Sequence, residues 1–389
     1  MAAAFSSSEY ERRRQEILQA MQARGLDALL IGEPANVTWA TGYDAWSFYT
    51  PQYLLVDQTG ALIWLGRLMD AGAARFTTFL PEAQVIAYPE DLVQRAGVHA
   101  GDWVGAWMRD HGLGTARIGY ESDAYQFSPR SLAAVQNQLP DATWIDADLL
   151  VNWCRFVKSD AEIDLMRKSA RLAEHAAETA LSGLRAGRRQ SDLMADVVAA
   201  GLRGPAEFGG DLTAVPPLLL AGEKASTAHP SWDDSLFESG QTVAFELGGC
   251  HRRYNVGLAR TGHIGVLPDD RRKVSDAVQD GMHAVMQAAR PGATGGEVHA
   301  AWAGVLRRYG LTKASRIGYS IGCGYSPDWG EHTFSVRPQE RCELQQNAVI
   351  HVILGMWMDD WGLELSETLH ITPQGADKLC HFSWDVREV

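Results

Sequence analysis

The sequence predicts a mixed α/β (α+β) fold of two domains, and three observations carry this expectation. The chain has 389 residues, which is more than one typical domain holds. Across roughly the first 150 residues, short apolar runs of strand length alternate with segments of helical periodicity. Near residue 158 the pattern changes and a long amphipathic helix begins. The composition, 46% hydrophobic and 21% charged, is ordinary for a globular chain with sizeable cores.

The first domain is expected to be α/β. A helix begins near Ser7 or Ser8, because apolar residues, including Ile17 and Met21, then recur on one helical face. Residues 57–60 (DQTG) divide two apolar runs and predict a hairpin. The expected strands are 28–31, 53–56, 61–65 and 116–120.

The boundary between the domains is expected near residues 155–163. Ser159 or Asp160 can cap the start of a helix, and Glu162 adds a favourable charge in its first turn. The domains would therefore span residues 1–157 and 158–389. After this helix, the expected helices are 190–202, 269–289 and 296–309. The expected strands are 214–221, 242–247, 251–261, 351–359 and 363–371.

Charge and cysteine content limit the possible partners. A net charge of −13 and a pI near 5.4 argue against a nucleic-acid or anionic-membrane surface. Five cysteines without a CxxC pair fit free thiols in a reducing compartment. The N-terminus shows no signal-peptide core, and no apolar run is long enough to span a bilayer. We expect a cytoplasmic enzyme.

Two neighbouring segments carry the most informative motif. Residues 240–246 read GQTVAFE, and residues 254–261 read YNVGLART. They resemble the metal-site strand pair of the creatinase/aminopeptidase, or pita-bread, family, in which aspartate ligands stand where this chain has Glu246 and Gly257. The resemblance covers nearly the whole chain. It implies a creatinase-type α/β N-terminal domain followed by a pita-bread catalytic domain.

The same resemblance assigns the family's metal ligands to residues that cannot build a dinuclear site. The family's turn that carries a ligand histidine matches residues 318–322, which contain a tyrosine instead. A two-metal site needs several carboxylate oxygens and an imidazole. We therefore expect no metal and no other cofactor. The five ligand positions are occupied by Glu246, Gly257, Tyr319, Ile353 and Ser366.

Three strings resemble the ectoine hydrolases within this family, namely residues 42–49, 318–331 and 355–362. The resemblance implies metal-independent opening of the cyclic amidine ring of ectoine or 5-hydroxyectoine, which yields N-acetyl-2,4-diaminobutyrate. Three alternatives stay open: hydrolysis of another small guanidine or amidine such as creatine, a non-catalytic binding protein, and a metal-dependent Xaa-Pro peptidase.

Four residues are candidates for catalysis. His229 matches the proposed general base of creatinase, although it is also compatible with a structural role beside a proline. Glu246 is expected to bind an amidinium, with an arginine ion pair as the alternative. Tyr319 could donate its phenol proton to the substrate or be a core tyrosine. Glu367 follows the former ligand position by one residue, so strand alternation favours the opposite face.

Two groups of residues are candidates for substrate binding. The aromatic loop 42–52 contains Trp46 and Phe48, which are expected to form a wall for a small cation in the partner subunit of a homodimer. An ordinary hydrophobic anchor is the alternative for this loop. The second group includes Arg253, which like Arg252 could hold a substrate carboxylate. The second group also includes Asp328, Trp329 and Glu331, in a segment equally compatible with a surface loop built on a proline turn.

Overall fold

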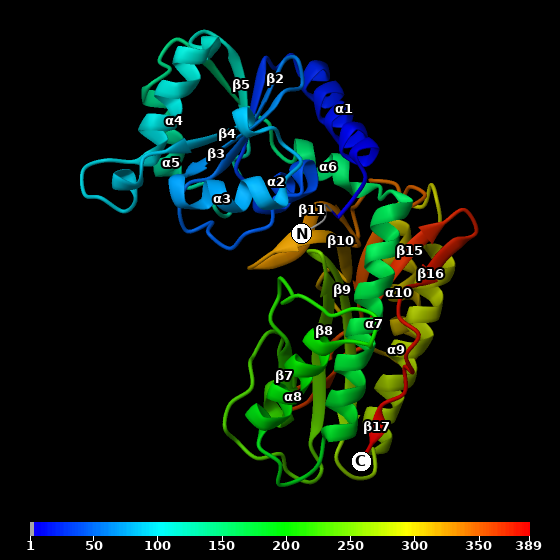
Figure 1. Ribbon diagram of the computed structural model, residues 1–389. Helices are drawn as coiled ribbons and strands as arrows, with labels where there is room; N and C mark the ends of the chain where they lie inside the picture. The colour runs from blue at the N-terminus through cyan, green and yellow to red at the C-terminus, as the bar shows by residue number, and fades with distance from the viewer. Residues whose placement is uncertain (1–3) are drawn as a thin grey trace. The chain divides into compact units, whose positions relative to one another are not determined.

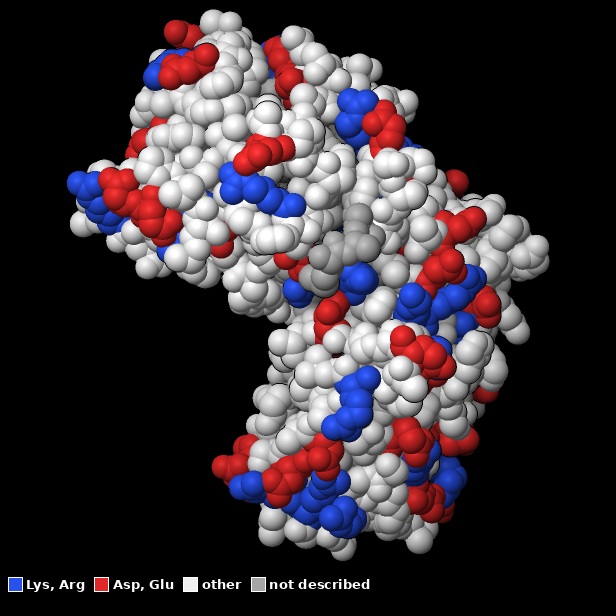
Figure 2. Space-filling model, viewed as in Figure 1, with Lys and Arg blue, Asp and Glu red and all other residues white. Residues whose placement is uncertain are grey.

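The computed structural model describes residues 4–389, and the chain divides into two compact units, residues 1–155 and 156–389 (Figure 1). No helix within residues 4–389 is both long enough and apolar enough to cross a membrane. On the face shown in Figure 2, basic and acidic side chains are interspersed, so the described residues of that face form no broad basic surface for a phosphate backbone.

A six-stranded sheet forms the centre of the N-terminal unit, in the order β4-β3-β2-β1-β5-β6. β1, β2 and β3 pair antiparallel, and the other neighbours pair parallel. The predicted strand at 28–31 and the hairpin after it are confirmed. The strands are β1 (Ala28–Ile31), β2 (Tyr53–Asp57), β3 (Leu62–Arg67), β4 (Val85–Tyr88), β5 (Arg117–Tyr120) and β6 (Thr143–Asp146).

Helices cover both faces of this sheet and make it a three-layer α/β unit. One core cluster holds side chains from α1, α2, α3 and α6, and a second cluster holds side chains from α4 and α5. The predicted first helix is confirmed, with Ser6 as the N-cap that accepts a hydrogen bond from the backbone of Glu9. The helices are α1 (Ser7–Ala23), α2 (Pro34–Thr41), α3 (Leu68–Thr77), α4 (Ala100–Met108), α5 (Pro129–Asn137) and α6 (Leu150–Phe156).

The C-terminal unit is built on a nine-stranded sheet in which β16-β15-β12-β10-β9-β8-β7 are neighbours. β11 pairs with β10, β17 pairs with β9, and the two short strands β13 and β14 form a separate ribbon. The strands are β7 (Leu218–Ala221), β8 (Thr242–His251), β9 (Tyr254–His263), β10 (Gly318–Tyr325), β11 (Asp328–Ser335), β12 (Val349–Ile353), β13 (Met356–Trp357), β14 (Gly362–Leu363), β15 (Ser366–Thr372), β16 (Gly375–Lys378) and β17 (Arg387–Glu388).

Four helices accompany this sheet. α7 packs along β8 and β9, while α9 and α10 pack against each other and contribute side chains to a core cluster of this unit. Ser159 caps α7 in a capping box with Glu162, as the sequence predicts. The helices are α7 (Asp160–Gly183), α8 (Gln190–Arg203), α9 (Asp269–Ala288) and α10 (Gly295–Tyr309).

Two expectations about local structure are wrong. The strand expected at 214–221 begins only at Leu218, and Pro216 and Pro217, which have no N–H to donate to a ladder, precede it. Residues 318–322 form the start of β10 rather than a turn. The segment after it is a β10–β11 hairpin, not a surface loop, so its acidic and aromatic residues lie on strands of the main sheet.

Candidate functional site

The C-terminal unit contains a cavity of ≈430 Å³ whose walls come from β7, β8, β10, β11 and the chain around β12–β14. Its apolar wall includes Leu218, Leu220, Ile353 and Trp357. The titratable side chains that face it are His229, Glu246, Lys313, Arg316, Tyr319, Asp328 and Glu364. The cavity thus brings together four of the residues expected from the sequence, in the size range of sites for small molecules.

Glu246 stands near the middle of β8, where it is opposite Ala259 of β9 and Leu218 of β7. It is only 9% exposed, and its carboxylate has no hydrogen-bond or ion-pair partner within residues 4–389. Burial, with a smaller contribution from the charge of Asp328, raises the pKa of Glu246 to about 7. The arginine ion pair considered from the sequence does not form, and the carboxylate is left facing the cavity.

A second carboxyl, Glu364, faces the same cavity and was not expected from the sequence. It follows β14, and its backbone N–H and C=O both bond the hydroxyl of Thr261, at 2.8 and 2.9 Å. Burial and then the charge of Glu246 raise the pKa of Glu364 well above its usual range. Strand alternation could have revealed it, since Glu364 stands two residues before Ser366, a former ligand position.

Two cations lie on another part of the cavity wall. Lys313 donates to the carbonyl of Gly355, and its ammonium lies 3.9 Å from the ring centroid of Trp357. Burial lowers the pKa of Lys313 to about 8, although the charge of Glu364 opposes this shift. The guanidinium of Arg316 lies 4.8 Å from the ring centroid of Tyr319. The cavity therefore combines unpaired carboxyls with amino and guanidinium groups.

The β10–β11 hairpin supplies the aromatic and acidic side of the cavity. Trp329 Nε1 donates to the hydroxyl of Tyr319 at 2.9 Å, and burial raises the pKa of that phenol. Burial opposes ionisation of Asp328, but hydrogen bonds from His332 and the backbone of Gly330 prevail and lower its pKa. Tyr319 and Asp328 thus line the cavity directly, while the buried Trp329 orients the phenol from behind it.

His229 lies on an exposed part of the cavity wall. Its backbone has a positive φ of 71°, an uncommon conformation for a residue other than glycine. The side chain is exposed, and it has no hydrogen-bond partner in the described part of the chain. An accessible imidazole beside a buried carboxylate can exchange protons with water and with a bound molecule.

Comparison with known proteins matches residues 164–373 to the metallopeptidase family M24 model and residues 13–157 to the creatinase/prolidase N-terminal domain. The chain belongs to metallopeptidase family M24. It is similar to the ectoine hydrolase of Halomonas elongata, with 34% identity over 97% of this chain and 96% of that protein. It is also similar to an uncharacterized hydrolase/peptidase of Sinorhizobium fredii, with 35% identity over 96% of each chain.

Solved structures show the same M24 architecture. A prolidase from Thermococcus sibiricus superposes with a TM-score of 0.84 at 15% identity, over 99% of this chain and 100% of that one. The dipeptidase PepE from Mycobacterium ulcerans gives a TM-score of 0.82 at 20% identity, over 99% of each chain. The predicted fold, a creatinase-type α/β domain followed by a pita-bread domain, is confirmed.

Membership of M24 implies a metal centre, but the residues of this chain do not fit one. Gly257 offers no ligand, and a Cβ built on it would lie 2.4 Å from Cε1 of His351. The imidazole of His351 therefore fills the space that a side chain at 257 would need. Its Nε2 lies 2.8 Å from the hydroxyl of Ser366, and burial lowers its pKa to about 3, so the ring is neutral.

His351 was not expected from the sequence, although it shares a face of β12 with Ile353, two residues further on. Its ring stands edge-on to Tyr319 and Trp329, at centroid distances of 5.7 and 5.8 Å. Within residues 4–389, no group of three or more histidine, cysteine, aspartate or glutamate side chains is arranged to hold a metal ion.

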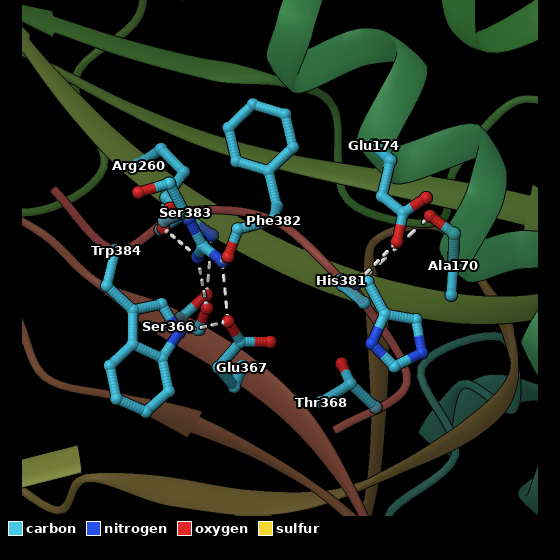
Figure 3. A network of polar contacts seen from close by, with 12 residues as sticks. Ala170, Glu174, Arg260, Ser366, Glu367, Thr368, His381, Phe382, Ser383 and Trp384 are labelled. Carbon is cyan, nitrogen blue, oxygen red and sulfur yellow. Dashed lines mark hydrogen bonds and ion pairs between the residues drawn. The ribbon is translucent and has the colours of Figure 1, made fainter. Parts of the chain in front are cut away.

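Glu367 is placed away from the cavity, on the other face of β15. Its carboxylate accepts from Arg260 Nη2 at 2.5 Å and from Trp384 Nε1 at 2.6 Å, as Figure 3 shows. Both members of the ion pair are buried. Burial raises the pKa of Glu367 although Arg260 opposes the shift. A carboxylate enclosed by these partners does not reach the cavity, so we assign Glu367 no catalytic contact.

Two expected binding residues also lie outside the cavity. Glu331 forms a buried ion pair with Lys158 at 2.6 Å, which joins β11 to the chain just before α7. The guanidinium of Arg253 lies 4.7 Å from the ring centroid of Tyr325, at the β8–β9 turn. Neither side chain lines the described cavity, where Lys313 and Arg316 are the lysine and arginine of the wall.

The two aromatic residues of the first unit differ in environment. Trp46 is 66% exposed, whereas Phe48 is partly buried against a core cluster and stands edge-on to Tyr43 at 6.1 Å. Phe48 thus has the anchoring environment considered as its alternative. Trp46 keeps its indole ring accessible.

Proposed function

We propose that this M24-family hydrolase opens a small cyclic amidine of the ectoine type without a metal ion. The observation that carries the proposal is Glu246, a buried carboxylate that has no partner within residues 4–389 and faces a cavity for a small molecule. A charge in such a place is stable only when a cation pairs with it. An amidinium supplies that positive charge, and an N–H of its ring can donate a charge-assisted hydrogen bond to the carboxylate.

The remaining groups of the cavity fit the other features of ectoine, which carries a carboxylate besides its amidinium. Lys313 and Arg316 can bind that carboxylate, while Tyr319 offers a phenol donor. The apolar wall formed by Leu218, Leu220 and Ile353 can pack against the carbon atoms of the ring. The similarity to the Halomonas elongata ectoine hydrolase supports the same substrate class.

In the reaction that we propose, Glu246 either binds the amidinium through an N–H group or attacks the ring carbon directly. His229 takes a proton from the incoming water and later returns it to the departing ring nitrogen. No Lewis acid is needed, because the amidinium carbon already carries the positive charge that makes it electrophilic. The product is N-acetyl-2,4-diaminobutyrate, in which one ring nitrogen has become an ammonium group.

We also propose a homodimer in which the accessible Trp46 of one subunit covers the substrate bound by its partner. An indole face attracts an organic cation by about 0.5–2 kcal/mol. The 66% exposure of Trp46 supports this assignment.

The experiment that tests this function is turnover of a substrate panel by the wild type and by Glu246→Gln. The panel contains ectoine, 5-hydroxyectoine, creatine and an Xaa-Pro dipeptide. We expect ring opening of ectoine by the wild type and a large loss in the variant, which keeps the shape of the side chain but removes its charge. Cleavage of the dipeptide but of no amidine would reject the proposal.

A further inference from the structure

Glu364 is a second buried carboxyl in the cavity, and the mechanism proposed above does not use it. The residue is 4% exposed, and its carboxyl group has no hydrogen-bond or ion-pair partner in the part of the chain that the structure describes. Unsatisfied buried carboxyls are costly, so two of them facing one cavity suggest a shared task.

Hydrogen bonds fasten the backbone of Glu364 to β9, which pairs with the strand that carries Glu246. Thr261, which binds both backbone groups of Glu364, is opposite Ala244 in the β8–β9 ladder. Two residues along, Ala259 is opposite Glu246 and donates its N–H to the hydroxyl of Ser366 at 2.6 Å. The segment around residues 364–366 is thus fastened to β9 at the positions opposite Ala244 and Glu246, and the charges of the two carboxyls act on each other.

The stoichiometry of amidine hydrolysis gives such a carboxyl a role. An amidinium and a water molecule become an amide and an ammonium ion, so the positive charge is conserved. The departing ring nitrogen begins with one hydrogen and ends with three. Both protons come from the water, and therefore two protons must travel from one oxygen to one nitrogen. A single proton carrier would have to transfer a proton twice in each turnover, whereas two carriers would each transfer one proton.

Resting on the proposed function, we propose that Glu364 is a catalytic general acid that protonates the ring nitrogen as its bond to carbon breaks. In this sequence His229 takes the first proton from water, and the resulting hydroxide adds to the amidinium carbon. Glu364 gives its proton to the nitrogen, the C–N bond breaks, and the hydroxyl of the intermediate returns a proton to Glu364. His229 then protonates the free amine. The assignment is the same if Glu246 attacks first, because the nitrogen must be protonated in either route.

The surroundings of Glu364 suit an acid that gives and regains a proton. Glu246, with its negative charge, favours the protonated form of Glu364, whereas Lys313 across the cavity favours the ionised form. Arg316, Asp328 and His229 line the remainder of the cavity. Before the reaction one proton resides on the Glu246–Glu364 pair, and the arriving amidinium draws the negative charge to Glu246, which leaves the proton on Glu364.

The test is Glu364→Gln, which preserves size but cannot donate a carboxyl proton. With ectoine, kcat should fall by about 10²–10⁴ while KM changes little. The alkaline limb of the wild-type pH profile, where Glu364 loses its proton, should be absent from the residual activity of the variant. A matched control is Glu121→Gln, which alters a buried carboxyl of the N-terminal unit and should leave kcat unchanged. Thermal melting verifies that both variants are folded.

A second measurement separates acid catalysis from a structural defect. Hydrolysis of N-phenylacetamidine at the C–N bond to its phenyl-bearing nitrogen gives acetamide and aniline, a weakly basic amine that needs little protonation in order to leave, and only this release of aniline is followed. We expect its hydrolysis to lose much less than that of ectoine in Glu364→Gln. Likewise, wild-type kcat across N-substituted acetamidines should depend only weakly on the basicity of the leaving amine, and this comparison needs no variant.

The outcomes are distinct. Wild-type turnover of ectoine together with an unimpaired, folded Glu364→Gln variant overturns this assignment alone. An equal loss for ectoine and N-phenylacetamidine, or a steep dependence of the wild-type rate on leaving-group basicity, also overturns it. A wild-type enzyme that hydrolyses no amidine overturns the proposed function and this assignment with it.

Discussion

Replacing Glu246 by glutamine should stabilise the protein increasingly as the pH rises from about 4.5, with nearly the full gain reached at about pH 7 and above. Burial raises the pKa of Glu246 from 4.5 to about 7. Since one pKa unit corresponds to about 1.4 kcal/mol, the ionised folded protein loses about 3 kcal/mol relative to the protonated one. The stability is fully present below about pH 4.5 and is lost as the pH rises through about 7, because the folded state binds the proton more tightly than the unfolded state.

The assay compares urea unfolding of the wild type and Glu246→Gln at pH 4.5 and pH 8, followed by tryptophan fluorescence. The free energies of unfolding should agree within about 1 kcal/mol at pH 4.5, and the variant should be about 3 kcal/mol more stable at pH 8. Glu343→Gln, at an exposed position, is the control and should show no such pH-dependent gain. Saturating acetamidinium should restore the free energy of unfolding that the wild type loses at pH 8. An equal difference at both pH values would refute the reasoning.

Three further changes test other parts of the site. Gly257→Ala should lower stability by about 1–3 kcal/mol, because its Cβ would lie 2.4 Å from His351. Differential scanning calorimetry measures this loss. The control is Gly72→Ala, whose Cβ would meet open space and should not lower stability. His229→Ala should reduce kcat for ectoine by about 10²–10⁴ with little change in substrate affinity by calorimetry, and wild-type turnover would remove His229 from the mechanism. Trp46→Ala should raise KM or lower kcat without lowering the melting temperature, because the ring is 66% exposed; unchanged kinetics would contradict its role over the substrate.

Local signals made the fold predictable from the sequence. The start of α7 is determined by residues three apart, Ser159 and Glu162, whose capping box needs no distant partner. The strand pair that carries Glu246 was expected from the resemblance of residues 240–246 and 254–261 to the family's metal-site strands, and the two strands pair antiparallel. The strand predicted at 214–221 begins only at Leu218, because the two prolines before it have no N–H to donate to a neighbouring strand.

The site was predictable only where the position on a strand determines which way a side chain points. The family spacing placed Glu246 and Tyr319 at strand positions that face the site, and both side chains line the cavity. Glu367 and Glu331 have the same chemistry, but their cationic partners are 107 and 173 residues away in sequence. Such ion pairs are tertiary and leave no local pattern.

The two unexpected residues illustrate the same limit. His351 and Glu364 owe their properties to burial, since burial lowers the pKa of His351 to about 3 and raises that of Glu364. Neither shift can be read from a sequence without the fold. Their strand alternation relative to the former ligand positions was the one signal that was available.

The most direct test of the account is the fate of ectoine in the presence of chelated enzyme, followed by proton NMR, with the metal content of the same sample measured by elemental analysis. The account predicts that enzyme stripped of metal converts ectoine to N-acetyl-2,4-diaminobutyrate at the rate of the untreated protein, and that Glu246→Gln does not. The account would be contradicted by product that forms only after a divalent metal is restored. It would also be contradicted by an ectoine signal that the folded wild-type protein leaves unchanged.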